Sequence, residues 1–376
     1  MSDVYSSFVL LGYVTIVHLF LVNIVLGIAI FIPILEYIYL KRKDNDIKEI
    51  AKRMFKVMVV IDLFAGVWAT WITVFLAGFW PLLTFYATTV LFIPITISLI
   101  GILISLPSIG VYWFTWEKIN EKLHFLIGII LAIGTTMVPI GFNMIFSFIN
   151  DPVGLNQALQ NNDLYAVFAN PLYPEFTLHR IFGALTLVSL LYTGIFLYRY
   201  WKTGQEVYRK GAGIFIYASL PIILVESILG AIYAMELNIN SGYIASSVLG
   251  PFYSQNYSGS LFPVFMVFMI LVFLLWIILF YLLYAYNKNL KSLKLSLSLS
   301  ILSLVTLPLG EFINDYSRYP YFIVTGNTGI PASDFFNNIM NISTGWVIVS
   351  VVVSVILAGV FSYYLYQILL KEKYSE

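Results

Sequence analysis

The stretch LFPVFMVFMILVFLLWIILFYLLYAY, residues 261–286, contains no charged residue and no histidine. A helix needs about 20 apolar residues to cross the hydrocarbon core of a bilayer, and this stretch is longer than that. Similar runs recur along the chain, at residues 8–39, 57–79, 88–114, 123–149, 176–198, 212–235, 261–286, 295–312 and 342–370. The sequence therefore predicts an all-α membrane protein of about nine transmembrane helices, the eighth of which closes on Pro308 and Gly310.

The composition agrees with a membrane protein. Of the 376 residues, 60% are hydrophobic and 10% are charged, whereas a soluble domain carries roughly 25% charged residues. We therefore expect residues 1–376 to form a single membrane domain. The first apolar run has no basic region before it and is interpreted as a true helix rather than a removed signal. The net charge of +1 argues against nucleic acid as a partner.

Lysine and arginine are distributed unevenly between the two sides of this topology. All of the 20 basic residues except Arg180 and Arg318 fall in alternate inter-helix loops or in the C-terminal tail, and seven of them lie between Lys41 and Lys56 in the first loop. Because cytoplasmic loops are enriched in these residues, we expect a plasma-membrane protein with its N-terminus outside and its C-terminus cytoplasmic. Arg180 and Arg318 fall on the outer side, where a specific interaction is expected to hold them.

The outer loops and the histidines are the first candidates for function. Three outer loops, at about 150–175, 237–260 and 314–341, are rich in polar residues and are predicted to cap a membrane site. The chain has no cysteine, which excludes iron–sulfur clusters and covalently attached c-type haem. A haem would have to be held by histidine, methionine or a carboxylate. His18 lies inside the first helix and is either a ligand or a neutral imidazole bonded to a neighbouring helix. His124 begins the fourth helix beside Lys122 and is predicted to be interfacial.

A second group of candidates lies near the outer face. His179 and Arg180 begin the fifth helix, and Met266 and Met269 begin the seventh helix at similar depth. A histidine and a methionine that face each other across a bundle can supply both axial ligands of a low-spin haem b, and Arg180 can pair with a haem propionate. The alternative for the methionines is ordinary packing. Arg180 also lies at a suitable depth to pair with Glu226 of the sixth helix.

Carboxylates occupy both ends of the predicted bundle. Asp315 lies with Arg318 at the outer end of the eighth helix, where it either ligates iron or forms a surface ion pair. Glu36 and Asp62 lie near the inner ends of the first two helices. Carboxylates in this position can load protons from the cytoplasm. The alternative for Glu36 is an interfacial position near the Lys41–Lys43 cluster.

Several segments share a pattern with one known family. They are His18 followed by Glu36-Tyr37-Ile38-Tyr39, then Phe64-Ala65-Gly66-Val67, then Ile109-Gly110-Val111-Tyr112-Trp113-Phe114-Thr115-Trp116-Glu117-Lys118 with His124 after it, then Asn150-Asp151-Pro152-Val153-Gly154, then Asn170-Pro171 with His179 after it, and finally Asp315-Tyr316-Ser317-Arg318-Tyr319-Pro320-Tyr321. In this order the segments resemble subunit I of cytochrome bd oxidase. The resemblance extends over most of the chain.

The resemblance implies a role for each candidate ligand. His18 matches the axial ligand of a haem at the oxygen-reducing pair. His179 matches the ligand of the low-spin haem b, with a methionine of the seventh helix opposite, for which Met266 is preferred over Met269. Asp315 falls where the family has a glutamate ligand to the other high-spin haem. Arg318 likewise matches the arginine that follows that ligand in the family.

The chain also departs from the family pattern. Ser105 stands where the family has a third-helix glutamate on its proton path. The segment Leu237–Ser260 contains no Lys, Arg, Asp or Glu, whereas the family's quinol loop is longer and charged. The arginine expected before the seventh-helix methionine is missing. The haem-binding positions are therefore better kept than those for quinol and protons.

Together these features predict a haem-containing subunit of a bd-type terminal oxidase, which passes electrons from quinol or another donor to oxygen in a respiratory chain. The resemblance implies haem b in low-spin and high-spin forms, leaves haem d open for the high-spin site, and implies a second membrane subunit, either subunit II-like or a paralogue. Glu36 and Asp62 are the candidate proton path. One alternative is an electron-transfer cytochrome b that holds a haem only at His179. Another is a haem-free transporter or structural paralogue.

Overall fold

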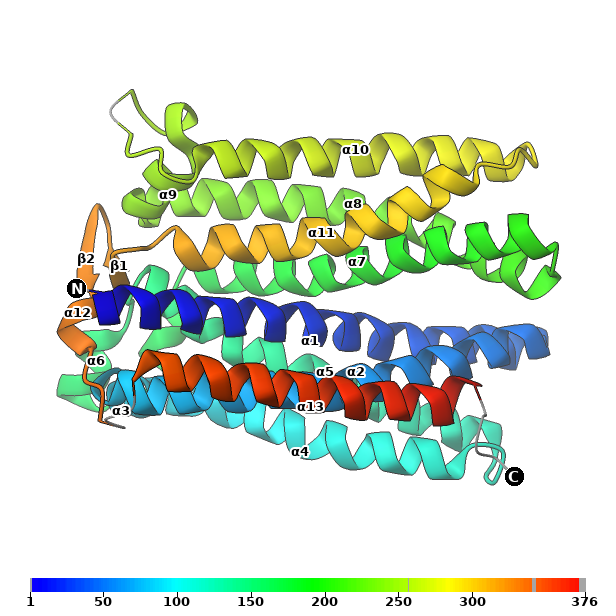
Figure 1. The fold of residues 1–376 in the computed structure, drawn as a ribbon, viewed down its shortest axis with the longest axis horizontal. Helices are drawn as coiled ribbons and strands as arrows, with labels where there is room; N and C mark the ends of the chain where they lie inside the picture. The colour runs from blue at the N-terminus through cyan, green and yellow to red at the C-terminus, as the bar shows by residue number, and fades with distance from the viewer. Residues whose placement is uncertain (1, 256, 340–342, 372–376) are drawn as a thin grey trace.

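The computed structural model describes residues 2–255, 257–339 and 343–371, and its long helices lie side by side in one elongated bundle (Figure 1). These helices are α1 (Ser2–Arg42), α2 (Asn45–Phe79), α4 (Phe92–Thr115), α5 (Glu121–Asn150), α7 (Leu172–Thr203), α8 (Glu206–Asn240), α10 (Phe262–Asn287), α11 (Leu293–Tyr316) and α13 (Thr344–Lys371). Within the described residues, 8 helices are long and apolar enough to cross a membrane, and α13 adds a shorter apolar stretch, Gly345–Leu357. The predicted all-α membrane fold is confirmed.

The short elements gather mainly at one end of the bundle, which we call the hairpin end (Figure 1). They are α3 (Pro81–Val90), α6 (Leu155–Asn161), the 3₁₀ turns η1 (Ala166–Ala169) and η2 (Gly250–Phe252), α9 (Gly242–Leu249), α12 (Ala332–Phe335) and the antiparallel strands β1 (Tyr321–Thr325) and β2 (Thr328–Pro331). The β1–β2 hairpin is tied to α9, because the Tyr243 backbone N–H donates to the Gly326 carbonyl at 2.9 Å. The three polar loops therefore come together over one end of the bundle.

The opposite end of the bundle, which we call the basic end, contains the short connections between α1 and α2, α4 and α5, α7 and α8, and α10 and α11 (Figure 1). These connections and the helix turns beside them carry the lysines and arginines of the alternate inter-helix loops. Of the two tail lysines in the same predicted group, Lys371 ends α13 and Lys373 lies outside the described residues. The alternation of the helices thus agrees with the predicted grouping of charge. The assignment of the basic end to the cytoplasm stays a prediction.

Three helix boundaries differ from the sequence prediction. The helix α2 begins at Asn45, where the Asp44 side chain caps it by accepting from the Asp46 backbone N–H at 3.0 Å. Most of the predicted first loop is therefore helical, because charged turns can continue a membrane helix beyond the bilayer. The predicted segment 88–114 is broken at Leu91, between α3 and α4. The helix α11 continues through Pro308 to Tyr316, since neighbouring helices satisfy the backbone around a proline in a membrane bundle.

Small residues let the central helices approach one another closely. A Cβ atom on Gly27 of α1 would lie 2.5 Å from Val188 Cγ2 of α7, and one on Gly194 of α7 would overlap the hydroxyl of Ser300 on α11. Close contact through small residues is the usual means by which membrane helices associate. It holds α1, α7 and α11 together, and these are the helices that carry His18, His179 and Asp315.

Candidate functional site

The first candidate ligand, His18, is held by the neighbouring helix. Its Nδ1 lies 3.1 Å from the carbonyl oxygen of Ala65 on α2. A carbonyl oxygen can only accept, so Nδ1 must carry the proton and Nε2 keeps the lone pair. Metal-ligating imidazoles are normally held in this way by their second nitrogen. The bond to a neighbouring helix, which the sequence analysis gave as the alternative to a ligand role, is therefore also the arrangement that suits a ligand.

The second candidate, His179, is held by a carboxylate. Its Nδ1 lies 2.9 Å from Glu226 Oε1 on α8, which is an ion-pair contact without the geometry of a hydrogen bond, and its ring stacks on Tyr233 of the same helix with 6.0 Å between ring centroids. Gly230 leaves room for the ring, because a Cβ atom there would lie 3.1 Å from His179 Cε1. The partner of Glu226 is therefore His179, and the predicted pairing of Glu226 with Arg180 is wrong. A carboxylate on Nδ1 again leaves Nε2 for a metal.

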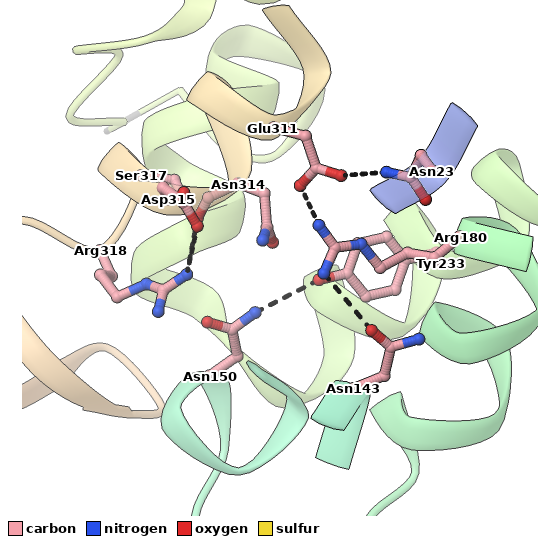
Figure 2. A network of polar contacts seen from close by, with 10 residues as sticks. All are labelled: Asn23, Asn143, Asn150, Arg180, Tyr233, Glu311, Asn314, Asp315, Ser317 and Arg318. Atoms are coloured by element: carbon pink, nitrogen blue, oxygen red, sulfur yellow. Dashed lines mark hydrogen bonds and ion pairs between the residues drawn. The ribbon is translucent and has the colours of Figure 1, made fainter. Parts of the chain in front are cut away.

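Arg180 instead joins a buried network across four helices (Figure 2). Its guanidinium forms an ion pair with Glu311 of α11 and lies 3.4 Å from Asn143 Oδ1 of α5. Glu311 also accepts from Asn23 Nδ2 of α1 at 3.3 Å. The side chains of Arg180 and Glu311 are 7% and 9% exposed. Each therefore neutralises the buried charge of the other, which would cost several kcal/mol without a partner. Glu311 was not among the residues predicted from the sequence, although a carboxylate inside an apolar segment is a signal by itself.

Asp315 and Arg318 lie beside this network, at the hairpin end of α11 (Figure 2). They are 5% and 4% exposed, so the predicted alternative of a surface ion pair is wrong. Arg318 Nη2 is 3.7 Å from Asp315 Oδ1, which is an ion-pair contact, and its hydrogen bond goes to the Asn314 carbonyl at 2.9 Å. Among the described residues, no group donates a hydrogen bond to either Asp315 oxygen. A buried carboxylate in this state requires a proton or a ligand.

The candidate methionines lie on α10, at its hairpin end. Met269 is 44% exposed and Met266 is half-buried. The helix α10 packs mainly on α11, α9 and α8, while the groups found against the His179 ring belong to α8. The opposed histidine–methionine pair therefore stays a prediction for both methionines.

The carboxylates predicted near the inner face have different surroundings. Glu36 is 6% exposed, and its Oε1 lies 2.6 Å from His124 Nδ1, which is itself 6% exposed. Both side chains are therefore buried by protein, and their expected interfacial depth stays a prediction. Asp62 is half-buried in the middle of α2, because that helix begins at Asn45 and a rise of 1.5 Å per residue puts Asp62 roughly 25 Å along it.

The fold and these sites define a multi-pass helical membrane protein whose half-buried histidines, His18 and His179, and buried carboxylate, Asp315, suit a metal-containing cofactor. Residues 7–241, more than half of the chain, match the family model described as cytochrome bd terminal oxidase subunit I. The chain belongs to this family, and membership implies haem cofactors.

Individual relatives support the match. Residues of this chain are 26% identical over 216 positions to "Cytochrome bd ubiquinol oxidase subunit 1" of Bacillus subtilis, an alignment that covers 56% of this chain and 46% of the relative. They are 20% identical over 263 positions to "Putative cytochrome bd menaquinol oxidase subunit I" of the same organism. This alignment covers 69% of this chain and 58% of the relative. The chain thus spans about half the length of the curated relatives it matches.

A solved structure supports the fold. The bd oxidase from Geobacillus thermodenitrificans superimposes with a TM-score of 0.81 at 18% sequence identity, over 98% of this chain and 97% of the other. At this identity the likeness establishes the fold. The candidate ligands fit a haem by their own chemistry, since His18 Nδ1 is hydrogen-bonded to a carbonyl oxygen, His179 Nδ1 is in ion-pair contact with a carboxylate, and the buried Asp315 carboxylate has no donor among the described residues.

Proposed function

We propose that this chain is the haem-bearing subunit of a bd-type terminal oxidase that passes electrons from quinol, or another donor, to oxygen. The observation that carries the proposal is the contact between His179 Nδ1 and Glu226 Oε1 at 2.9 Å. A carboxylate in contact with one nitrogen of an imidazole favours the orientation in which the other nitrogen is available, and it raises the basicity of the imidazole as a metal ligand. Membership of the bd subunit I family supports the same assignment.

In this proposal, the residues of the hairpin end divide the work of holding haem. His179 would hold a low-spin haem b, with Met266 or Met269 as its second axial ligand. His18 and Asp315 would hold the two haems of the oxygen-reducing pair, as haem b or haem d. When bound, the haems would supply the one-electron redox chemistry and the binding of oxygen.

The two buried arginines would act through charge. Arg318 lies close enough to Asp315 to stabilise its ionised form, which is the form that ligates iron. Arg180 is occupied by Glu311 and would hold α7 against α11 rather than bind a propionate directly. Fixing these two helices keeps His179 and Asp315 at a constant separation, which electron transfer between their haems requires.

The names of the relatives and one uncharged segment bear on the electron donor. The relatives are named as ubiquinol and putative menaquinol oxidases, which supports a quinol as the donor. The uncharged stretch Leu237–Ser260, part of which forms α9, would be the place to look for altered donor contacts. We propose that a second membrane subunit, subunit II-like or a paralogue, completes the complex.

The test is a reduced-minus-oxidised spectrum of the purified chain with its native partners, together with haem extraction. The expected result is a low-spin haem b signal and a second species that binds carbon monoxide in the reduced state. A single low-spin haem without the carbon monoxide-binding species would make the chain an electron-transfer cytochrome b. A preparation without any haem would overturn the proposal in favour of a transporter or a structural paralogue.

A further inference from the structure

A buried pair at the basic end of the bundle takes no part in the proposed haem site. Glu36 of α1 and His124 of α5 are both 6% exposed, and Glu36 Oε1 lies 2.6 Å from His124 Nδ1. The other imidazole nitrogen, Nε2, lies 3.1 Å from the carbonyl oxygen of Tyr112 on α4. Three spanning helices therefore meet at one ionisable pair, and such residues inside a membrane are functional candidates by default.

The hydrogen bonds of His124 fix how many protons the pair holds. The carbonyl oxygen of Tyr112 can only accept, so Nε2 must be protonated. The remaining nitrogen and Glu36 Oε1 are 2.6 Å apart, a distance that two lone pairs without a proton between them cannot hold. The pair therefore keeps one further proton between Nδ1 and Oε1, which makes it an imidazolium with a carboxylate or a neutral imidazole with a carboxylic acid.

A second acceptor on the same carboxyl group is vacant. Glu36 Oε2 is buried and accepts no hydrogen bond of normal geometry from the described residues, and the Tyr112 hydroxyl, which lies near the same carboxyl group, is also buried without such a bond. It faces Gly128 of α5, where an added Cβ atom would lie 3.2 Å from it. Since the carboxyl oxygen of a buried pair must otherwise be satisfied, Oε2 is a position at which one more proton can be bound.

A small cavity connects the pair with the basic end. Its volume is about 30 Å³, and its lining includes Glu36, His124, Tyr39, Lys48, Glu117 and Glu121. That volume is sufficient for a water molecule. A water there would have the polar partners that it needs, because both residues of the pair and the charged groups at the mouth border the same space.

The mouth of the cavity carries carboxylates that can exchange protons with solvent. Lys43 Nζ lies 2.6 Å from Glu121 Oε2, and Lys48 Nζ lies 3.5 Å from Glu117 Oε1. Tyr39 donates a hydrogen bond to Glu121. These residues and Tyr112 are the titratable and charged groups that face the pair from α1, α2, α4, α5 and the loop between α4 and α5.

We infer that Glu36 and His124 form a proton-holding site, which takes protons from the basic end through the cavity and passes them toward the hairpin end. In each step a proton from a cavity water binds Glu36 Oε2, and a proton then leaves toward the interior. The step is a proton transfer only, and neither residue is oxidised or reduced. The role in oxygen reduction rests on the proposed function, because reducing oxygen to water consumes protons. The helix α4, which also lines the pair, contains no Asp, Glu, His, Lys or Arg that could serve instead.

The experiment uses the full chain with its partners in lipid nanodiscs and measures infrared difference spectra between two pH values. In the wild type, the carbonyl band of a protonated carboxylic acid should grow as the pH falls and shift in heavy water. Glu36→Gln should remove this band. His124→Gln keeps a side chain that can reach the same partners, so it should shift the frequency of this band without removing it. Loss in Glu36→Gln together with a move in His124→Gln supports the site.

Two further variants of the same chain test a competing carboxyl group and serve as a control. Asp62→Asn removes the other intramembrane carboxyl group predicted for protons, and Glu206→Gln removes an exposed one at the basic end. If the band survives Glu36→Gln and disappears in Asp62→Asn, the inference is overturned. Glu206→Gln should change neither the band nor the haem spectrum.

A kinetic measurement separates this inference from the proposed function. Proton uptake that follows chemical reduction is recorded with a pH-sensitive dye, and Glu36→Gln should slow it roughly 10²-fold while the haem spectrum stays unchanged. A wild-type chain without haem would overturn the proposed function and leave the infrared assignment of the site in place. Normal uptake in Glu36→Gln with haem present would overturn the inference alone.

Discussion

The two ends of this bundle both place histidines beside carboxylates, yet they leave them in different states. In the half of the bundle toward the hairpin end, His179 and His18 each have Nδ1 near one acceptor group, a carboxylate or a carbonyl. At the basic end, both nitrogens of His124 are occupied, by Glu36 and by the carbonyl of Tyr112. A histidine with a remaining lone pair suits a metal, and a histidine with both nitrogens engaged suits a proton. The number of engaged nitrogens therefore separates the two functions better than the residue type does.

The groups around the histidines also differ between the two ends, in line with metal binding at one end and proton binding at the other. The hairpin end has a buried carboxylate, Asp315, that receives no hydrogen bond from the described residues, beneath a cover of short elements. The basic end has a cavity with a mouth of lysine–glutamate pairs. A buried acceptor without a donor favours a ligand that brings positive charge, while a charged mouth favours exchange with water.

The largest expected effect comes from removing a ligand at the hairpin end. His179→Ala should abolish the low-spin haem signal, because no other group replaces its Nε2. The matched change at the basic end, His124→Ala, should leave the haem spectrum in place, since both of its nitrogens are engaged elsewhere. Reduced-minus-oxidised spectra of both variants check the pair, and a low-spin signal that survives in His179→Ala contradicts the assignment.

A second comparison concerns ion pairs. Arg180→Met leaves Glu311 buried without its counter-charge and should lower the free energy of unfolding by about 3–5 kcal/mol. Lys43→Met breaks the Lys43–Glu121 pair, whose side chains are 63% and 42% exposed. This change should lower the free energy of unfolding by less than about 1 kcal/mol. Unfolding of both variants in mixed detergent micelles measures the difference. Equal losses would show that the buried network is no more important than the exposed pair.

A smaller effect is expected from the carboxylate behind the ligand. Glu226→Gln keeps the size of the side chain but removes the charge that orients His179, and it should weaken haem affinity by roughly 10- to 100-fold. Glu206→Gln, an exposed change in the first turn of the same helix, is the control. Haem content after competition with a haem-binding apoprotein gives the measurement, and unchanged content in Glu226→Gln would remove this carboxylate from the site.

The smallest effect belongs to the surface of the basic end. Lys210 donates to Asp44 and lowers the pKa of its carboxyl group below the usual value. Because the pKa is lower in the folded state, the contribution to stability is present at neutral pH and is lost as the pH falls through the lowered pKa. Asp44→Asn should therefore be slightly less stable than the wild type at neutral pH, and the gap should close in acid. Unfolding curves at several pH values below about 4 test the trend, and a gap that widens in acid would contradict it.

Much of the fold could be predicted, because apolar length and basic loops act locally along the chain. Eight of the nine apolar segments each correspond to a single helix in the described residues, and the third is interrupted at Leu91 between α3 and α4. The other errors fell where charged or proline residues suggested a loop, at the start of α2 and within α11. Lys48 and Pro308 are both helical, since helix ends extend into the interface and neighbouring helices tolerate a proline.

The candidate site was predicted less completely. The positions of His18, His179 and Asp315 in an apolar chain were enough to select them as ligands. Their partners could not be selected, because Glu226 lies 47 residues from His179 in sequence and meets it only through the packing of α8 on α7. Glu311 could have been noticed as a buried acidic residue, but nothing local links it to Arg180.

Composition and residue spacing are enough to show that this chain crosses a membrane repeatedly, which end of the bundle is basic, and which few residues can bind a metal or a proton. Those properties depend on composition and on spacing along a single helix. The tertiary structure alone decided which nitrogen of each histidine is engaged, that Asp315 and Arg318 are buried, and that Glu36 meets His124. Hydrogen bonds and burial at these points come from contacts between helices, and a contact between distant segments leaves no periodic signal in the sequence of either one.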